Sequence, residues 1–430
     1  MTTTRPPARP RPGDTPPPEP GPGADPGASA AGPSRGRSAV IRVRRIFGAE
    51  TPEYFVLLGT TVFLVLFGLV MVLSSSSIES FVTDRDFFAR TSRQAILAVI
   101  GIPLMLLASR APRVFWRRWA WHAMLGALVL QMLVIVLAWG RDDVGYNNNW
   151  LSIAGFSFQP SEFIKLAFVI WLALIVTRKA PVVNDWRSHD WRQVALPLAP
   201  VAGGAVLLVM LGNDLGTTII LTAMVLGAMF FAGIRLRIMG AITAVLAVGA
   251  FVAIRSSSSR SDRIDAWLTG CIDVDTSAPD LAWLCYQPLH GWQALAHGGL
   301  FGVGLGNSEA KWNWLPEAET DFIFAVIGEE LGLVGALLVI ILFVVLAVCF
   351  VRIIRRQTDP FAKLATSIAM MWIIGQALVN IAVVLGMLPV LGVPLPFISA
   401  GGSSLVTSLA AVGVVLSFAR HDPRREERTR

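Results

Sequence analysis

Apolar stretches long enough to cross a lipid bilayer recur along most of the chain. From Glu53 onward, runs of about 17–24 mostly apolar residues follow one another, and each can span the ~30 Å hydrocarbon core as a helix. Ten such stretches are centred near residues 64, 100, 130, 169, 204, 223, 246, 340, 375 and 409. Only 15% of the residues are charged, against about 25% in soluble domains. We therefore predict an all-α, polytopic membrane protein with ten transmembrane helices.

The count of ten depends on how residues 195–231 are divided. Only the four residues 212–215 separate the fifth apolar stretch from the sixth. The two stretches together hold about 38 apolar residues, which is enough to cross the bilayer twice. A count of nine is the alternative.

Basic residues gather in alternate loops between the apolar stretches. Arginine and lysine lie between helices two and three, four and five, six and seven, and eight and nine, and again after helix ten. The positive-inside rule places these loops and both termini in the cytoplasm. The net charge of +7 then follows from topology, so we expect no nucleic acid partner.

The two ends of the chain differ in composition from the rest. Eleven of the 26 prolines lie in the first forty residues, and nothing there could bury a core. Residues 1–48 are therefore predicted to be a disordered, Pro-rich cytoplasmic tail. This tail lacks the apolar region and cleavage site of a secretory signal, so we expect it to be retained. Residues 49–420 form the predicted transmembrane domain, and residues 421–430 form a basic cytoplasmic tail.

One predicted extracytoplasmic loop, residues 255–320 between helices seven and eight, is much longer than the others. A loop of this length without a clear helix pattern is usually functional. Its Trp, Gly and Pro residues predict short re-entrant or interfacial segments packed against the bundle. Cys271 and Cys285 both lie in this loop, and a disulfide between them could close it in an oxidising compartment. Cys349 is expected in the core of helix eight.

Ionisable side chains within apolar segments are costly, so each is a functional candidate. At the start of helix four, residues 159–165 read QPSEFIK. Pro160 suits a first helical position, and Glu162 and Lys165 share one helix face and can pair. The pair could be structural, or Lys165 could bind an anionic headgroup or a diphosphate. Gln159 is expected to support this site.

Two further polar clusters lie near the ends of helices. Asp214 begins helix six, where the helix dipole favours a carboxylate, and N-capping explains it better than direct catalysis. Before helix ten, residues 388–404 contain three prolines and a Gly-Gly pair. This composition predicts a broken, re-entrant segment whose hydroxyls, including those of Ser403 and Ser404, face a cavity. A tightly packed loop is the alternative.

The acidic residues at the start of helix eight are the most informative. Thr320 could be the N-cap, with Asp321 in the first turn. Glu329 and Glu330 follow two turns deeper and need buried partners. A partly desolvated carboxylate at a bilayer surface suits general base chemistry, because burial raises its pKa towards the operating pH.

Three basic residues of the long loop could neutralise a phosphorylated leaving group: Lys311, Arg260 and Arg263. The two arginines could equally be solvated loop charges. The sequence contains no zinc pattern, P-loop or dinucleotide fingerprint, and whether a metal binds stays unknown at this point.

Four segments together resemble the SEDS family (shape, elongation, division and sporulation) of bacterial membrane glycosyltransferases. The resemblance covers residues 50–420. Its strongest elements are QPSEF at 159–163, DLGTT at 214–218, KWNWLPEAETDFIFAVIGEELG at 311–332 and PLPFISAGGSS at 394–404. The third segment looks more like the division branch (FtsW type) than the elongation branch (RodA type). The chain departs from the family at Glu319, where a His is common, and at residues 147–150, which lack an arginine.

The resemblance implies a peptidoglycan glycosyltransferase that polymerises lipid II into glycan strands at the outer face of the cytoplasmic membrane during cell division. Asp321 would be the general base of an inverting transfer. The leaving diphosphate would be stabilised by Lys311, Lys165, Arg260 or Arg263, with a divalent cation (Mg²⁺ or Mn²⁺) as an additional option. The implied partners are a class B penicillin-binding protein (a transpeptidase) and other division proteins.

Two other functions stay open from the residues. A lipid II flippase would fit ten helices with buried charges, although such transporters usually contain an inverted repeat, and none is evident. A non-catalytic scaffold of the division machinery would leave Asp321 replaceable.

Overall fold

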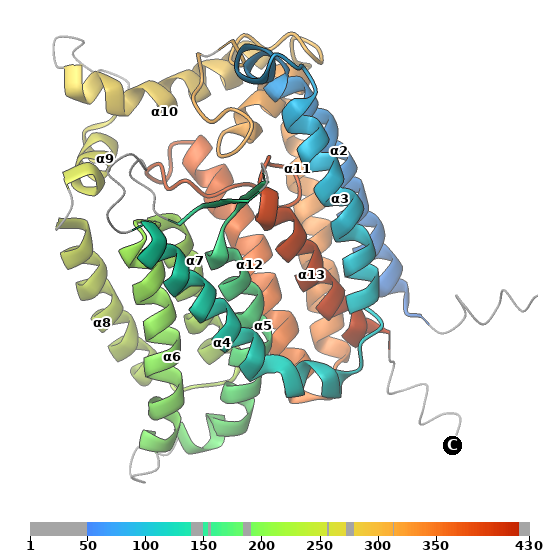
Figure 1. The fold of residues 1–430 in the computed structure, drawn as a ribbon, viewed down its shortest axis with the longest axis vertical. Coiled ribbons are helices and arrows are strands. Elements are labelled where there is room, and N and C mark those ends of the chain that lie inside the picture. Colours follow the sequence, from blue (N-terminus) through green and yellow to red (C-terminus); the bar gives the residue numbers. More distant parts are fainter. Residues whose placement is uncertain are drawn as a thin grey trace, which may run out of the picture. The chain divides into compact units, whose positions relative to one another are not determined.

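The computed structural model describes residues 50–138, 149–153, 156–183, 191–255, 258–271, 279–312 and 314–420. The predicted tails, 1–48 and 421–430, lie outside the described residues. Within those ranges the chain is a helical bundle with one short β-hairpin (Figure 1). Each of the ten apolar stretches forms a helix: α2 Pro52–Asp84, α3 Ala89–Ala108, α4 Arg113–Ala138, α5 Pro160–Val183, α6 Trp191–Leu211, α7 Leu215–Phe231, α8 Leu236–Arg255, α11 Ile323–Arg356, α12 Pro360–Val384 and α13 Gly402–Ala419.

The helices differ in how well they suit a bilayer. Seven of those in the described ranges are long and apolar enough to cross one, namely α2, α3, α4, α5, α11, α12 and α13. The apolar parts of α6, α7 and α8 are shorter, at 10–17 residues. The predicted division between α6 and α7 is confirmed, because the chain turns at residues 212–214 with Asn213 at φ 68°. The all-α fold is confirmed, whereas the number of crossings stays a prediction.

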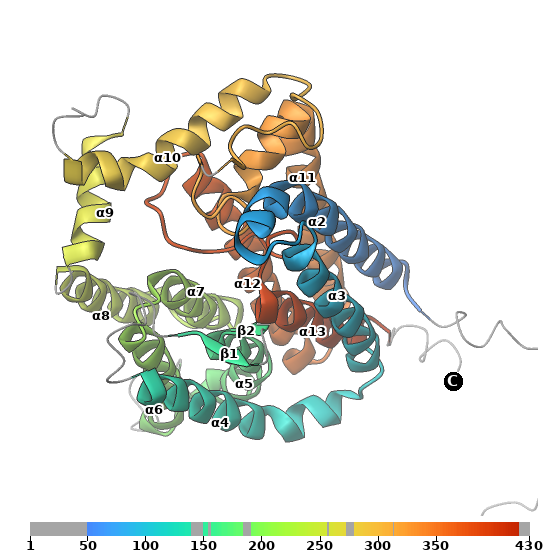
Figure 2. The ribbon, with the colours of Figure 1, turned by 45° about the horizontal axis from the view of Figure 1, so that its top comes forward.

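The long loop contains two helices that the sequence pattern did not reveal. These are α9 Ser258–Thr269 and α10 Pro279–Gly298, and α10 lies across one end of the bundle (Figures 1 and 2). The expectation of short segments was wrong for α10, whose 20 residues include Pro288 in the interior. Glycine lets α10 approach α11 closely, since a Cβ on Gly298 would lie 2.0 Å from the carbonyl oxygen of Gly328.

Helix α11 is broken near its start, at Gly332 (φ 67°, ψ −167°). The segment 299–304 supplies the hydrogen bonds that the break removes. The donor–acceptor pairs are Val303 N to Glu329 O, Gly304 N to Glu330 O, Leu333 N to Gly299 O and Val334 N to Leu300 O. The long loop is therefore part of the packed structure of α11.

The two ends of the described chain meet at one end of the bundle. Thr51 Oγ1 donates a hydrogen bond to the carbonyl of Ala419 at 3.0 Å, and Arg420 pairs with Glu50 at 3.1 Å. Arg356, in the last turn of α11, pairs with Glu53 at 2.6 Å. Both ends of the described chain and the basic end of α11 therefore lie at one end of the bundle.

Candidate functional site

Asp321 lies in a turn that precedes α11, not in the helix itself. The amides of Thr320 and Phe322 both donate to the carbonyl of Glu317, whose φ is 55°. The helix begins only at Ile323, with Phe322 at the N-cap position and no side-chain cap. The prediction that Thr320 caps the helix was wrong, because its hydroxyl donates instead to the carboxylate of Glu317 at 2.6 Å.

The backbone around Asp321 is fixed by the segment between α12 and α13. Asn380 of α12 donates through Nδ2 to the carbonyls of Asp321 (2.7 Å) and Val393 (2.8 Å). Ser399 Oγ donates to the carbonyl of Thr320 at 2.6 Å. The Asp321 turn and the 385–401 segment are therefore locked together. The prediction of a non-helical segment before α13 is confirmed, and the hydroxyl of Ser399 within it accepts from the amide of Leu395 and donates to the carbonyl of Thr320.

The carboxylate of Asp321 is sheltered and has no hydrogen-bond partner among the described residues. Asp321 is half-buried, and a Cβ on Gly392 would lie 3.5 Å from its Oδ2. Burial, together with the charges of Glu317 and Asp214, raises the pKa of Asp321 from its ordinary 3.8 to about 7, against the opposing charge of Arg263. A carboxylate with a pKa near neutrality can both accept and release a proton at physiological pH.

Asp214 supports the same region from the start of α7. Its carboxylate accepts from the amide of Thr217 at 2.8 Å, which confirms the predicted N-cap. The side chain of Gln159 donates through Nε2 to the other carboxylate oxygen of Asp214 at 2.7 Å. The backbone amide of Gln159 donates to Ser403 Oγ at 2.9 Å. Burial raises the pKa of Asp214. Ser403 and Ser404 are buried at the first turn of α13, and the Ser403 hydroxyl is engaged by Gln159.

The Glu162–Lys165 pair is confirmed and is deeply buried, with both side chains 1% exposed and 2.7 Å apart. Lys165 Nζ also donates to Gln376 Oε1 of α12 at 3.0 Å and lies 5.4 Å from the centre of the Trp372 ring. Thr407 of α13 donates to Glu162 at 3.3 Å. These contacts tie α5 to α12 and α13.

The two glutamates of α11 have the buried partners that their position requires. Glu329 contacts His297 Nδ1 at 3.0 Å and accepts from Ser308 and from the amides of residues 309 and 310. Glu330 accepts from Ser74 Oγ at 2.6 Å. The acid pair therefore holds the long loop against α11 and α2.

The basic candidates of the long loop have different surroundings. Lys311 is buried and its ammonium donates to the carbonyl of Gly306. Arg260 lies in α9, and its side chain is outside the described residues. Arg263, also in α9, is exposed, and its charge lowers the pKa of Asp321. Among the candidate cations, Arg263 is therefore the one whose charge affects the pKa of Asp321.

An ion cluster that the sequence interpretation missed lies beside this turn. Arg90, in the first turn of α3, pairs with Glu319 and, at 2.8 Å, with Glu79 of α2. Burial raises the pKa of Glu319 to about 7, although the charge of Arg90 opposes this shift. Arg90 could have been found by asking why an arginine stands at the edge of an apolar stretch.

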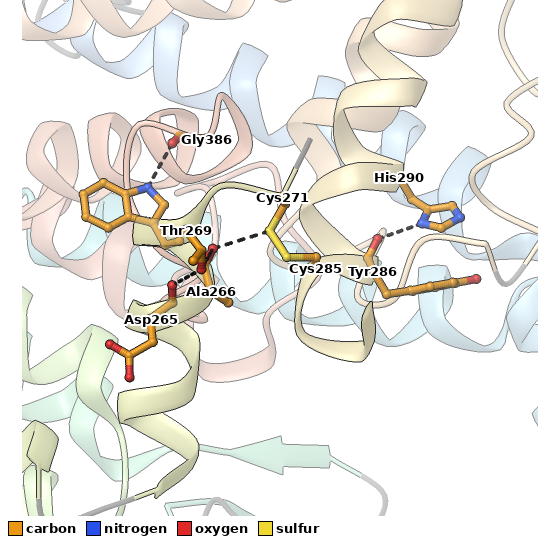
Figure 3. The surroundings of a disulfide bond; sticks show 9 residues. Asp265, Ala266, Thr269, Cys271, Cys285, Tyr286, His290 and Gly386 are labelled. Atoms are coloured by element: carbon orange, nitrogen blue, oxygen red, sulfur yellow. Dashed lines mark hydrogen bonds between the residues drawn. A yellow bond between two sulfur atoms is a disulfide. The ribbon is translucent and has the colours of Figure 1, made fainter. Parts of the chain in front are cut away.

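The disulfide between Cys271 and Cys285 is confirmed and joins the end of α9 to α10 (Figure 3). One helical turn before Cys271, Trp267 Nε1 donates to the carbonyl of Gly386 at 3.0 Å. These two links hold α9 against both α10 and the segment that follows α12. A cavity of about 330 Å³ lies between the three elements, and Arg263 is among its lining residues.

The chain matches known proteins over most of its length. The family model described as "Cell cycle protein", for FtsW, RodA and SpoVE, covers residues 55–424. A Mycobacterium tuberculosis protein named probable peptidoglycan glycosyltransferase FtsW is 37% identical over 397 residues, which are 92% of this chain and 72% of the relative. Stage V sporulation protein E of Bacillus subtilis is 33% identical, over 86% of this chain and 98% of the relative.

Two solved structures share the fold. One, described as "Structural coordination of polymerization and crosslinking by a peptidoglycan synthase complex", has a TM-score of 0.67 at 25% identity and covers 85% of this chain and 96% of that chain. The rod shape determining protein RodA of Thermus thermophilus has a TM-score of 0.60 at 24% identity, over 88% of this chain and 99% of that chain.

Proposed function

This chain belongs to the FtsW, RodA and SpoVE family of cell cycle proteins, and we propose that it polymerises lipid II into glycan strands of peptidoglycan, with Asp321 as the general base. It is a multi-pass membrane protein of the peptidoglycan glycosyltransferase class. The observation that carries the proposal is the state of Asp321, a sheltered carboxylate with a pKa of about 7 on a rigid turn.

The proposed reaction is an inverting glycosyl transfer. The 4-hydroxyl oxygen of the acceptor GlcNAc forms a bond to the anomeric carbon of the donor MurNAc. The bond from that carbon to the diphosphate breaks, and undecaprenyl diphosphate leaves with the bonding electron pair. Asp321 takes the hydroxyl proton and later releases it to water. In this scheme the growing strand is the donor, and a new lipid II molecule is the acceptor.

The leaving diphosphate requires positive charge. Arg263 is supported by its charge, which lowers the pKa of Asp321, and Arg260 lies less than one helical turn before it in α9. Lys311 and Lys165 could reach the diphosphate only by leaving their present hydrogen-bond acceptors.

A divalent cation is a separate proposal. Among the described residues, no cluster of three or more His, Cys, Asp or Glu side chains could hold a metal ion. No step above depends on Mg²⁺ or Mn²⁺.

Orientation and partners complete the proposal. The first and last described residues lie at the basic end of the bundle, which supports cytoplasmic termini and an Asp321 turn at the outer face. A solved relative is described as coordinating polymerization and crosslinking, which supports a class B penicillin-binding protein as partner. A role in division rather than elongation or sporulation is supported by relatives named FtsW. Depletion tests this role, since filamentous cells indicate division and rounded cells indicate elongation.

Purified full-length chain in detergent micelles, supplied with lipid II, tests the activity. We expect glycan polymer, which a gel separates by length. Micelles offer no second compartment, so transport alone cannot give this result. A flippase would make no polymer under these conditions, and that result would refute the proposal.

A further inference from the structure

The cavity between α9, α10 and the segment after α12 is lined by aromatic rings on more than one side. Trp267 comes from α9, Tyr286 and Trp292 come from α10, and Gly386 and Leu388 come from the segment after α12. Its volume of about 330 Å³ is at the lower end of the range for small-molecule sites. A space of this size accommodates one or two sugar rings.

The cavity walls are held in place by specific links. Trp267 donates to the carbonyl of Gly386, and the disulfide joins α9 to α10 (Figure 3). Gly386 has φ 76°, and a Cβ there would lie 2.4 Å from the Trp292 ring, so the loop packs directly on that indole. A preformed site of this kind loses less conformational entropy when a ligand binds.

The lining suits a saccharide better than a lipid tail. Three aromatic residues are among the lining residues, and aromatic rings can pack on the C–H face of a pyranose ring, while Gln287 and Arg263 of the lining supply polar groups. The cavity is formed by α9, α10 and the end of α12, and neither α9 nor α10 is among the candidate membrane spans of the described residues. A polyprenyl chain would stay with the spans, so only the part of the substrate that leaves the membrane can reach the cavity.

The segment after α12 connects the cavity to the reacting centre. Val390 lines the cavity, and two residues later a Cβ on Gly392 would lie 3.5 Å from Asp321 Oδ2. A glycan whose donor sugar lies at Asp321 can therefore continue into the cavity.

We infer that this aromatic cavity is a glycan subsite, which binds an N-acetylhexosamine ring of the growing strand. The inference rests on the proposed polymerase function. The subsite holds the strand between successive additions, so it determines product length.

Binding of a soluble glycan tests the inference without requiring turnover. The probe is a lipid-free, peptide-free peptidoglycan tetrasaccharide, titrated against the full-length chain in micelles by saturation-transfer NMR. We expect Trp267→Ala to weaken binding about tenfold, as truncation of an aromatic anchor commonly does. Trp267→Phe keeps an aromatic face and should stay within about threefold of the wild type. Trp312→Ala removes a tryptophan that is 61% exposed and lies outside the cavity lining, and it is the matched control.

The outcomes separate this inference from the proposed function. Asp321→Asn should bind the tetrasaccharide as the wild type does, and Trp267→Ala should give shorter strands from lipid II. Equal binding by Trp267→Ala and the wild type, or no binding by either, overturns the subsite even if polymer is made. Thermal midpoints of all variants identify any that fail to fold.

Discussion

The pH dependence of polymerisation should report the ionisation of Asp321. The carboxylate is the base, so only its ionised form can accept the hydroxyl proton. Its pKa is raised to about 7, so the active form predominates above pH 7 and is lost as the pH falls through 7. If Asp321 had its ordinary pKa of 3.8, its carboxylate would stay almost fully ionised down to about pH 5.

The expected change in rate with pH follows from the raised pKa of Asp321. With a pKa of about 7, roughly a tenth of Asp321 is ionised at pH 6 and roughly nine tenths at pH 8, so the rate should rise about tenfold between them. Neighbouring charges should move the midpoint. Glu317→Gln removes a like charge and should lower the midpoint, whereas Arg263→Gln removes an opposite charge and should raise it. Both residues are exposed, so each shift should be a fraction of a pH unit.

The assay is the initial rate of polymer formation in detergent at saturating lipid II, measured from pH 5 to pH 9. Glu319→Gln is a necessary control, because Glu319 also has a pKa of about 7. That variant should keep the wild-type midpoint if Asp321 is the group that titrates. A rate that stays flat from pH 5 to pH 9, or a midpoint that moves only in Glu319→Gln, would refute the reasoning.

Three further expectations concern residues around the site. Lys165→Ala should lower the free energy of unfolding by about 3–5 kcal/mol, because it leaves a buried carboxylate unpaired, and thermal unfolding in detergent would show this loss. Reduction of Cys271–Cys285, which closes a loop with a sequence separation of 14, removes about 3 kcal/mol of loop-closure stabilisation and should make α9 more sensitive to limited proteolysis. Gly392→Ala should slow polymerisation, because an alanine at φ 68° is strained by about 1–2 kcal/mol and this strained residue would lie in contact with Asp321 Oδ2. An unchanged rate in that variant would mean that the Gly392 segment does not shape the site.

The sequence was sufficient for the features that depend on local pattern. Hydrophobic length located all ten apolar helices, and a capping residue before an apolar run located Asp214. The i,i+3 spacing identified the Glu162–Lys165 pair. In each case the interacting groups are close in sequence, so propensity and spacing carry the information.

Features that depend on distant contacts could not be predicted in this way. The ion pair of Arg90 with Glu319 joins residues that are 229 positions apart. The break at Gly332 is stable only because segment 299–304 supplies replacement hydrogen bonds. Helix α10 was missed because Pro288 and several polar residues weaken its periodic signal, and packing on α11 compensates for this weakness. Thr320 is a good capping residue, but the turn before α11 continues past it. Its hydroxyl therefore contacts Glu317 instead of capping the helix.

The most direct measurement is the rate of glycosidic bond formation by Asp321→Asn at pH 8 and saturating lipid II, where substrate binding no longer limits the reaction. The amide keeps the size of the side chain but cannot accept the proton. We predict a rate about 10²–10⁴-fold below the wild type, with an unchanged thermal midpoint. A variant that polymerises lipid II at the wild-type rate would contradict the assignment of Asp321 as the general base.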